Sequence, residues 1–333
     1  MIAQINKEYF KTRPTKLWTR LISYGLFEGR PATTKGQWLN PFVFKLFELW
    51  KTFPQLTTVN SPVFIIGAGR SGTTLLGIIL SIHRDISFLN EPKALWHEIY
   101  GEEDIIGSYS NGKAYYSLDE CNVNESAISN AQKLYGAYLT ITGGSRVVDK
   151  YPELIFRVPF VKQLFPDAKF LFITRNGYDT LKSIELWSQR LGKQENGNVH
   201  DWWGVNNRKW RLMCEQLIPE SNYLQSYKTD ISKFQSHKDR ATVEWILTME
   251  KGIHIQYKFS ESIFTFKYEE LLNNHTNVIK KILHFTDLSM DKKLVEYANR
   301  AIRKPTLKKK VAIHPILIKP FLNLMEQYNY NTI

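Results

Sequence analysis

The sequence predicts an α/β fold, a mostly parallel β-sheet flanked by helices. Short apolar runs rich in β-branched residues alternate along the chain with longer stretches in which apolar residues recur at helical spacing. The 43% hydrophobic and 23% charged residues are ordinary for a globular protein, and 333 residues suffice to bury a sizeable core. Disordered, collagen-like and coiled-coil chains are therefore excluded.

The expected strands are short and are bounded by turn residues or followed by helices. The first covers residues 63–66, and the helix after it carries apolar residues at helical spacing from Leu75 to Ile82. Further strands are expected at residues 146–150, 169–174 and 263–266, and helices at 158–165, 178–187, 240–258 and from 268 onward. The polar stretches 101–130 and 190–209 are expected to be irregular loops that bind a substrate or act as lids.

Residues 1–58 differ from the rest of the chain because they mix basic residues with a dense aromatic and apolar stretch at residues 42–50. We expect a helical N-terminal segment packed on the core, followed by one α/β domain over residues 59–333. An amphipathic helix on a membrane surface is the alternative.

The net charge of +12 is concentrated in two segments. Residues 1–53 hold nine basic and three acidic side chains, and residues 300–310 hold six basic and no acidic ones. An anionic partner near these segments is expected: a phosphorylated ligand, an anionic membrane or nucleic acid. A solvated basic tail is the alternative for each segment.

The cellular compartment is predicted from what the sequence lacks. Its two cysteines, Cys121 and Cys214, exclude a disulfide scaffold and a zinc site built from cysteines. No window of about 18 apolar residues could span a membrane, and the N-terminus has no apolar signal region. We expect a cytoplasmic protein, with peripheral membrane contact through the basic N-terminus as a further option.

A glycine-rich turn follows the first predicted strand. Residues 67–74 read GAGRSGTT and match the phosphate-loop pattern G-x-x-x-x-G-K-[ST] except that Thr73 replaces the lysine. Such a loop directs backbone N–H groups and the positive end of the next helix at an anion. A strand-to-helix turn without a ligand is the alternative. The residues expected to contact a bound phosphate are Gly69, Arg70, Ser71, Gly72, Thr73 and Thr74.

The missing lysine changes the expected ligand. Nucleoside triphosphatases use this lysine on the β and γ phosphates, next to Mg²⁺. The strand at residues 169–174 also runs into Arg175 instead of an aspartate that could help to hold Mg²⁺. The sequence therefore predicts a P-loop, nucleotide-kinase-like fold that binds a smaller phosphate group without a metal ion.

These motifs resemble the sulfotransferases that use 3′-phosphoadenosine 5′-phosphosulfate (PAPS). Residues 63–76 resemble the family's 5′-phosphosulfate loop, and residues 170–187, with Arg175 and Ser183, resemble its 3′-phosphate motif. Asn90-Glu91-Pro92 and the DKYPE segment at residues 149–153 are similar to the branch that contains tyrosylprotein and bacterial carbohydrate sulfotransferases. A YE-x-L segment at residues 268–271 extends the resemblance, which spans about residues 60–310.

The resemblance implies a donor site with two anion-binding parts. PAPS would be the donor and adenosine 3′,5′-bisphosphate (PAP) the product, with no metal ion. The loop would bind the 5′-phosphate and sulfate end, and Arg175 with Ser183 would bind the 3′-phosphate. Tyr268 is expected near the adenine. Arg303 and Lys304, in the basic segment 300–310, are expected to close over the phosphates, unless that segment is a solvated tail.

The resemblance also implies three catalytic residues. Glu91 would be the general base, with its pKa raised by burial among Phe88, Leu89 and Pro92. Lys150 would stabilise the leaving oxygen, and Arg70 would act at the sulfate end of the donor. The weaker substitutes for the base are His83 and Glu98.

The acceptor carries no motif of its own. Trp202 and Trp203 lie in a polar stretch and are expected to contact the acceptor, whereas at least two of the four tryptophans at positions 202, 203, 210 and 245 are expected in the core. A carbohydrate or glycolipid hydroxyl is the expected acceptor. A protein tyrosine or a small alcohol remains open.

Two other classes of function remain as alternatives. One is a P-loop kinase or NTPase-like enzyme, which Mg²⁺-dependent ATP binding would support. The other is a non-catalytic protein that binds anions, nucleic acid or a membrane surface through the two basic segments. Nucleic acid is not the expected partner, because the sequence has no helix-turn-helix, zinc-finger or RNP signature.

Overall fold

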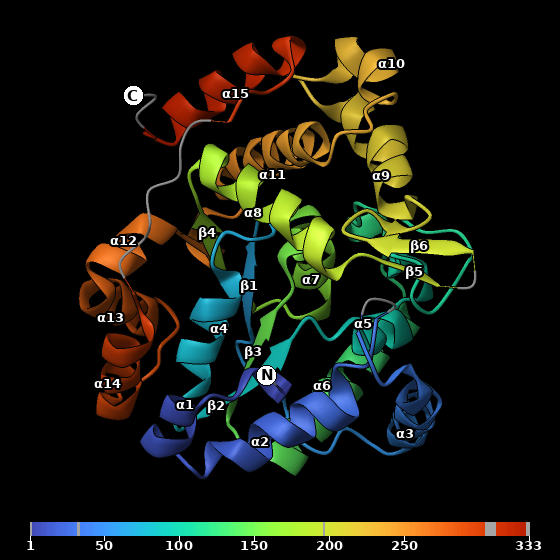
Figure 1. Cartoon of the computed structure of the whole chain (residues 1–333). Helices are drawn as coiled ribbons and strands as arrows, with labels where there is room; N and C mark the ends of the chain where they lie inside the picture. The colour runs from blue at the N-terminus through green and yellow to red at the C-terminus, as the bar shows by residue number, and fades with distance from the viewer. Residues whose placement is uncertain (1, 32–33, 196, 304–310, 331–333) are drawn as a thin grey trace.

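A five-stranded parallel sheet forms the centre of the molecule (Figure 1). The computed structural model describes residues 2–31, 34–195, 197–303 and 311–330. The strand order is β2-β3-β1-β4-β8, so β1 is central and β2 and β8 are the edges. The strands are β1 (Val63–Gly67), β2 (Ile86–Asn90), β3 (Arg146–Lys150), β4 (Lys169–Thr174) and β8 (Ile263–Lys267). The predicted α/β fold with a parallel sheet is confirmed.

Helices cover both faces of the sheet, and the strands are buried on both sides, as parallel strands usually are. Alternate residues of β1 point into opposite cores: Phe64 packs into one and Ile65 into the other. The larger core is formed with α3 (Asn40–Thr52), α5 (Lys93–Ile99), α6 (Glu125–Thr142), α7 (Val158–Leu164), α8 (Gly177–Leu191), α11 (His237–Lys258) and α15 (Pro315–Gln327). The smaller core is formed with α1 (Lys7–Thr12), α4 (Thr73–Ser81), α12 (Tyr268–Asn273), α13 (His275–Phe285) and α14 (Lys292–Ala301).

Most predicted elements are confirmed to within a few residues, and three differ. The edge strand β2 was not predicted. The polar stretch 190–209 contains a small antiparallel sheet of β5 (Lys193–Glu195), β6 (Asn198–Asp201) and β7 (Gly204–Val205), so the expectation of wholly irregular structure is wrong there. The strands of this small sheet lack the apolar alternation by which strands are recognised in a sequence. Hydrogen bonds between Asn206 and Val199 help to hold them together. The stretch 101–130, also expected to be irregular, contains the start of α6.

The N-terminal helices pack along one end of the molecule (Figure 1). Tyr9 is buried in the smaller core, and Phe27 and Phe47 are buried in the larger one. The helix α2 (Lys16–Ile22) lies against β2, and α1 lies against α14. None of the helices in the described ranges is long and apolar enough to cross a membrane.

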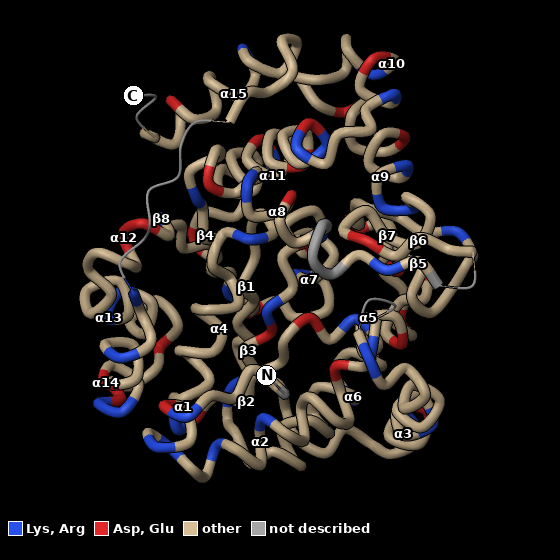
Figure 2. The backbone as a smooth tube through the Cα atoms, in the orientation of Figure 1, with Lys and Arg blue, Asp and Glu red and all other residues tan. Residues whose placement is uncertain are grey.

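Much of the positive charge of this segment is engaged within the protein. Arg20 is buried in an ion pair with Glu28, and Arg13 pairs with Asp291 at 2.8 Å. Arg300 lies 3.8 Å from Glu8, so the described start of the second basic segment adjoins the first segment where α1 meets α14 (Figure 2). Arg13 and Arg20 therefore add little to the positive charge that faces solvent.

A buried carboxyl lies in β3, beside the site described below. Asp149 Oδ2 accepts hydrogen bonds from Trp96 Nε1 at 2.9 Å and from the Tyr135 hydroxyl at 2.5 Å. Burial raises the pKa of Asp149 to about 7, although both hydrogen bonds lower it. The folded protein therefore holds this proton at a pH where the unfolded chain has released it.

This proton makes stability depend on pH. Between about pH 4 and 7 the native state binds more protons than the unfolded state. The unfolding free energy should therefore fall by up to about 1.4 kcal/mol for each unit that the pH rises across that range. We expect Asp149→Asn to remove this slope. Urea denaturation of both proteins from pH 4 to 8 tests it. Parallel pH profiles for the two proteins would contradict the assignment.

Candidate active site

All five strands of the large sheet deliver residues to one cavity at their carboxyl ends. The cavity has a volume of about 380 Å³. β1 leads into the glycine-rich loop, β2 into Glu91, β3 into Glu153, β4 into Arg175 and β8 into Tyr268. Lys150, the last residue of β3, is buried behind Glu91 and is not among the lining residues. Parallel strands bring these positions to a single edge, where the chain order reverses around β1 and ligands of α/β folds usually bind.

The glycines of the loop are required by close contacts and by backbone conformation. Gly72 has φ +94°, and a Cβ there would overlap the ring of Tyr268. A Cβ at Gly69 would overlap the indole of Trp202. Glycine at these two positions therefore lets aromatic rings from β8 and from the small sheet lie directly against the loop.

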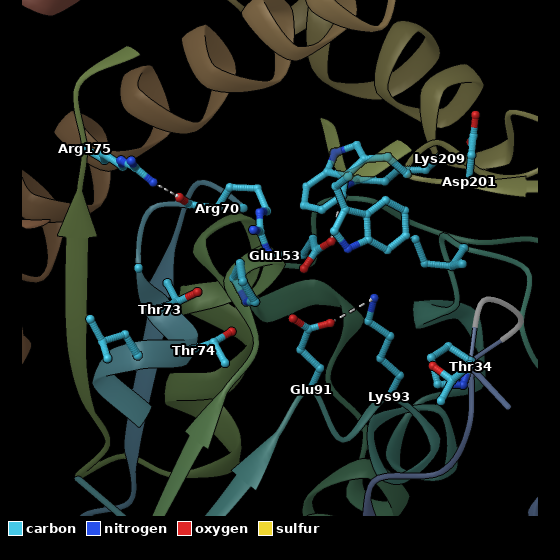
Figure 3. Close-up of a pocket in the computed structure, with 18 of the residues that line it drawn as sticks. Thr34, Arg70, Thr73, Thr74, Glu91, Lys93, Glu153, Arg175, Asp201 and Lys209 are labelled. Atoms are coloured by element: carbon cyan, nitrogen blue, oxygen red, sulfur yellow. Dashed lines mark hydrogen bonds and ion pairs between the residues drawn. The ribbon is translucent and has the colours of Figure 1, made fainter. Parts of the chain in front are cut away.

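The residues predicted for the two anion sites are brought together. Arg70 Nε donates to Ser183 Oγ at 3.0 Å, and Arg175 Nη1 donates to the Arg70 carbonyl at 2.7 Å (Figure 3). The Arg175 guanidinium lies over the Tyr268 ring, 4.6 Å from its centre. Within the described residues, Arg175 Nε is buried without a hydrogen-bond partner. An anion would satisfy this donor, so the donor set suits a phosphate group.

Two predicted phosphate contacts differ from expectation. Thr73 and Thr74 line the cavity, but the Ser71 hydroxyl is fully buried and donates to the Ala68 carbonyl. That hydroxyl stabilises the loop and does not face the cavity, so its predicted contact is wrong in this structure. Arg303 is exposed and is not among the described residues that line the cavity. Lys304 lies outside the described residues.

Glu91 follows β2 and lines the cavity, with 38% of its side chain exposed. Lys150 Nζ hydrogen-bonds to Glu91 Oε1, and Lys93 Nζ lies 3.6 Å from Glu91 Oε2. Burial raises the pKa of Glu91, but Lys150 and Lys93 together lower it by more. The expected upward shift of the Glu91 pKa is therefore wrong in the absence of ligands, because Lys150 and Lys93 both flank the carboxyl.

The weaker substitutes for the base lie elsewhere. His83 is fully buried, and its Nε2 is 2.8 Å from the Ser289 carbonyl. Glu98 pairs with Lys51 on α3. Of these three candidates, Glu91 is the one that lines the cavity.

A chain of alternating charges, which the sequence analysis missed, continues from Glu91 across the cavity (Figure 3). Lys209 is almost fully buried, 2.6 Å from Glu244 and 3.2 Å from Glu153. Burial raises the pKa of Glu153, but Lys209 and Lys93 outweigh it and lower that pKa to about 2. Lys93 could have been noticed two positions after Glu91, whereas nothing in the sequence singles out Lys209.

The two adjacent tryptophans have different environments. Trp202 lines the cavity, donates from Nε1 to Glu244 at 2.6 Å and contacts Trp187 edge to face. Trp203 is fully buried and donates from Nε1 to His237 at 2.7 Å. The predicted acceptor contact of Trp203 is therefore wrong. Trp210 and Trp245 are core residues, as expected of at least two of the four.

The part of the chain that holds the loop and most of the charged site residues matches the model of a known sequence family. The family model described as "Sulfotransferase family" matches residues 62–224, which include the loop, Glu91, Lys150 and Arg175. Over this stretch, just under half of its length, the chain is similar to that sulfotransferase family. The match covers the first four strands of the large sheet, and β8 lies beyond it.

Curated relatives share part of the sequence. Nodulation protein NoeE of Sinorhizobium fredii is 29% identical over 129 residues, 37% of this chain and 30% of that protein. Protein-tyrosine sulfotransferase A of Caenorhabditis elegans is 28% identical over 145 residues, 40% of this chain and 37% of that protein. The chain thus matches roughly a third of the length of these relatives. A sulfotransferase structure from Mycobacterium tuberculosis aligns with a TM-score of 0.47 at 14% identity, covering 88% of this chain and 87% of that one.

The buried charges predict a large effect of removing Lys209. Lys209→Met should lower the unfolding free energy at pH 7 by about 3–5 kcal/mol, since the buried carboxylates of Glu153 and Glu244 lose the lysine that they share. The deficit should shrink as the pH falls from 7 towards 4.5, because the pKa of Glu153 rises in the variant and the carboxyl takes up a proton. Urea denaturation at both pH values measures it.

Lys182→Met is the matched control. Its ion pair with Glu185 is exposed, with 43% and 25% of the two side chains accessible, so the loss should stay below about 1 kcal/mol. Equal losses of unfolding free energy in the two variants would show that the buried ion pairs of Lys209 stabilise the protein no more than an exposed pair does.

Proposed function

We propose that the chain is a sulfotransferase that moves a sulfuryl group from PAPS to an acceptor hydroxyl. The observation that carries the proposal is the convergence of two anion-binding parts, the loop and the Arg175 group, at the carboxyl edge of one sheet. Arg70 links the two parts through its contacts with Ser183 and Arg175. Two separate phosphates of one nucleotide fit such a pair of parts better than a single phosphate does.

The donor would lie across the loop and Arg175. Backbone N–H groups of the loop, Thr73 and Thr74 would bind the 5′-phosphate and the sulfate end. Arg175 and Ser183 would bind the 3′-phosphate, which would pair with the unsatisfied Arg175 Nε. Tyr268, held between Gly72 and Arg175, would lie beside the nucleotide.

Glu91 and Lys150 would divide the chemistry between them. As a bond forms from the acceptor oxygen to sulfur and the bond from sulfur to the phosphate oxygen breaks, Glu91 would take the acceptor's proton. Lys150 would stabilise the charge on the leaving phosphate oxygen. An anionic donor would compete with Glu91 for Lys150, so the pKa of Glu91 should rise towards a useful value when the donor binds.

A carbohydrate or glycolipid hydroxyl is the proposed acceptor. Trp187 and Trp202 line the cavity together with the carboxylates of Glu153 and Asp201. Aromatic faces stack on sugar rings and carboxylates accept bonds from sugar hydroxyls, so this lining suits a sugar. A protein tyrosine is the second candidate, because protein-tyrosine sulfotransferases are among the relatives.

Ligand binding tests the donor site first. We expect PAP without Mg²⁺ to stabilise the protein by about 2.7 kcal/mol at a hundred times its dissociation constant. AMP, which lacks the 3′-phosphate, should stabilise it less, and Arg175→Ala should abolish the difference. Thermal unfolding with PAP, AMP and ATP·Mg²⁺ measures this.

The same experiment separates the alternatives. Stabilisation by ATP·Mg²⁺ alone would support a kinase or NTPase-like enzyme. If a well-folded sample responds to none of the three, the motifs do not form a donor site, and the basic segments become the more promising binding surface.

Turnover tests Glu91. With labelled PAPS, an N-acetylglucosamine oligosaccharide and a tyrosine-containing peptide as acceptors, Glu91→Gln should lower the transfer rate by about 10²–10⁴-fold. The affinity of this variant for PAP should not fall, because both anion-binding parts remain and the carboxylate that competes for Lys150 is gone. Glu98→Gln is the control with the same chemical change outside the cavity. An active Glu91→Gln enzyme would assign the base to another residue.

A further inference from the structure

The edge strand β2 is completed by side chains instead of a neighbouring strand. One side of β2 pairs with β3, and the other faces the N-terminal helices. On that side, Lys16 Nζ donates to the Ile86 carbonyl at 2.7 Å, and Arg20 Nη1 donates to the Phe88 carbonyl at 3.3 Å. Glu28 Oε1 then accepts the Asn90 N–H at 2.7 Å. Three side chains thus serve every second residue of the strand edge.

The last of these contacts is rigidly held. Glu28 is buried, and both its oxygens accept from Arg20, at 2.6 and 2.9 Å. Arg20 is itself 2% exposed and donates further to the Ala3 carbonyl and to Gln4. A buried, bidentate pair has few alternative arrangements, so Glu28 presents its oxygen to Asn90 at a fixed position.

The Asn90 N–H directly precedes the candidate base. Glu91 has φ +50°, a left-handed conformation that a non-glycine residue keeps where its neighbours fix the backbone. The Glu91 N–H donates to the Lys150 carbonyl at 2.7 Å, and the Lys93 N–H donates to the Glu91 carbonyl at 2.7 Å. Together with the Glu28 contact, these bonds hold the turn that directs the Glu91 carboxyl into the cavity.

We propose that Glu28, held by Arg20, is a positioning residue for Glu91, so that the N-terminal segment forms part of the catalytic apparatus. The inference rests on the proposed function, in which Glu91 takes the acceptor's proton. The same segment continues to the cavity wall: Gly29 packs against Ala94, and Pro31 and Thr34 line the cavity. The segment therefore supports the base and also borders the space in which the acceptor would bind.

Two double variants that differ in one hydrogen-bond acceptor test the inference. Arg20→Met/Glu28→Leu removes the buried pair without leaving a lone charge, so the protein should fold. Arg20→Met/Glu28→Gln also removes the pair but keeps a carbonyl oxygen for the Asn90 N–H. Lys16→Met is the control, because it removes the analogous contact at Ile86, at the far end of β2 from Glu91.

Three quantities are measured: kcat for transfer from PAPS to whichever of the two acceptors above the wild type sulfates, the affinity for PAP, and hydrogen exchange over residues 86–93. We expect the Leu variant to lose about 10²-fold in kcat, the cost of a misplacement near 1 Å, with unchanged PAP affinity. Exchange at the Asn90 and Glu91 amides should be faster in it. The Gln variant should recover most of kcat, and Lys16→Met should remain close to the wild type.

The outcomes separate this inference from the proposed function. A Leu variant that binds PAP and keeps the wild-type kcat would overturn the positioning role, as would Gln and Leu variants that lose kcat equally. If the wild-type chain neither binds PAP nor transfers sulfate, the proposed function fails first. Hydrogen exchange then still shows whether Glu28 fixes the turn at Glu91, and equal exchange in the Leu variant and the wild type would refute it.

Discussion

Parallel pairing of the five strands is the constraint on which the candidate site depends. It brings the carboxyl ends of strands far apart in the sequence to one edge of the sheet. Asn90 is paired in register with Lys150, and Thr174 with Lys267, so Glu91, Arg175 and Tyr268 all emerge beside the loop after β1. Hydrogen bonds between main chains thus set the spacing of the side chains that would do the chemistry.

Within that frame, the cavity is governed by alternating charge. Lys150 and Lys93 flank the Glu91 carboxylate, and Lys209 lies between those of Glu153 and Glu244. The carboxylates of Glu91 and Glu153 stay ionised because neighbouring lysines offset their burial, as the low pKa of Glu153 shows. An anionic donor entering this network would redistribute the pairing, which ties the protonation of Glu91 to occupancy of the donor site.

The sequence was most informative where function depends on short local patterns. The apolar run before residue 67 and the glycines after it predicted β1 and its loop, and residues 169–175 predicted β4 and Arg175. The strand β2 was missed because its outer edge is satisfied by side chains some 60 to 70 residues earlier in the chain, which no local pattern shows. The sequence could not predict that Trp202 lines the cavity while Trp203 is buried. The two residues are identical neighbours, and their environments differ only because the backbone directs their side chains to different sides.

The edge of β2 also bears on the risk of aggregation while the chain folds. A strand edge with free N–H and C=O groups is a template for pairing with any other extended segment. In this protein Lys16, Arg20 and Glu28 occupy that edge, and a second strand would have to displace these three charged side chains to pair with it. The helix α2 thus blocks the pairing of β2 with a strand of another copy. Truncation of residues 2–30 would leave the edge of β2, next to the cavity, open to such pairing.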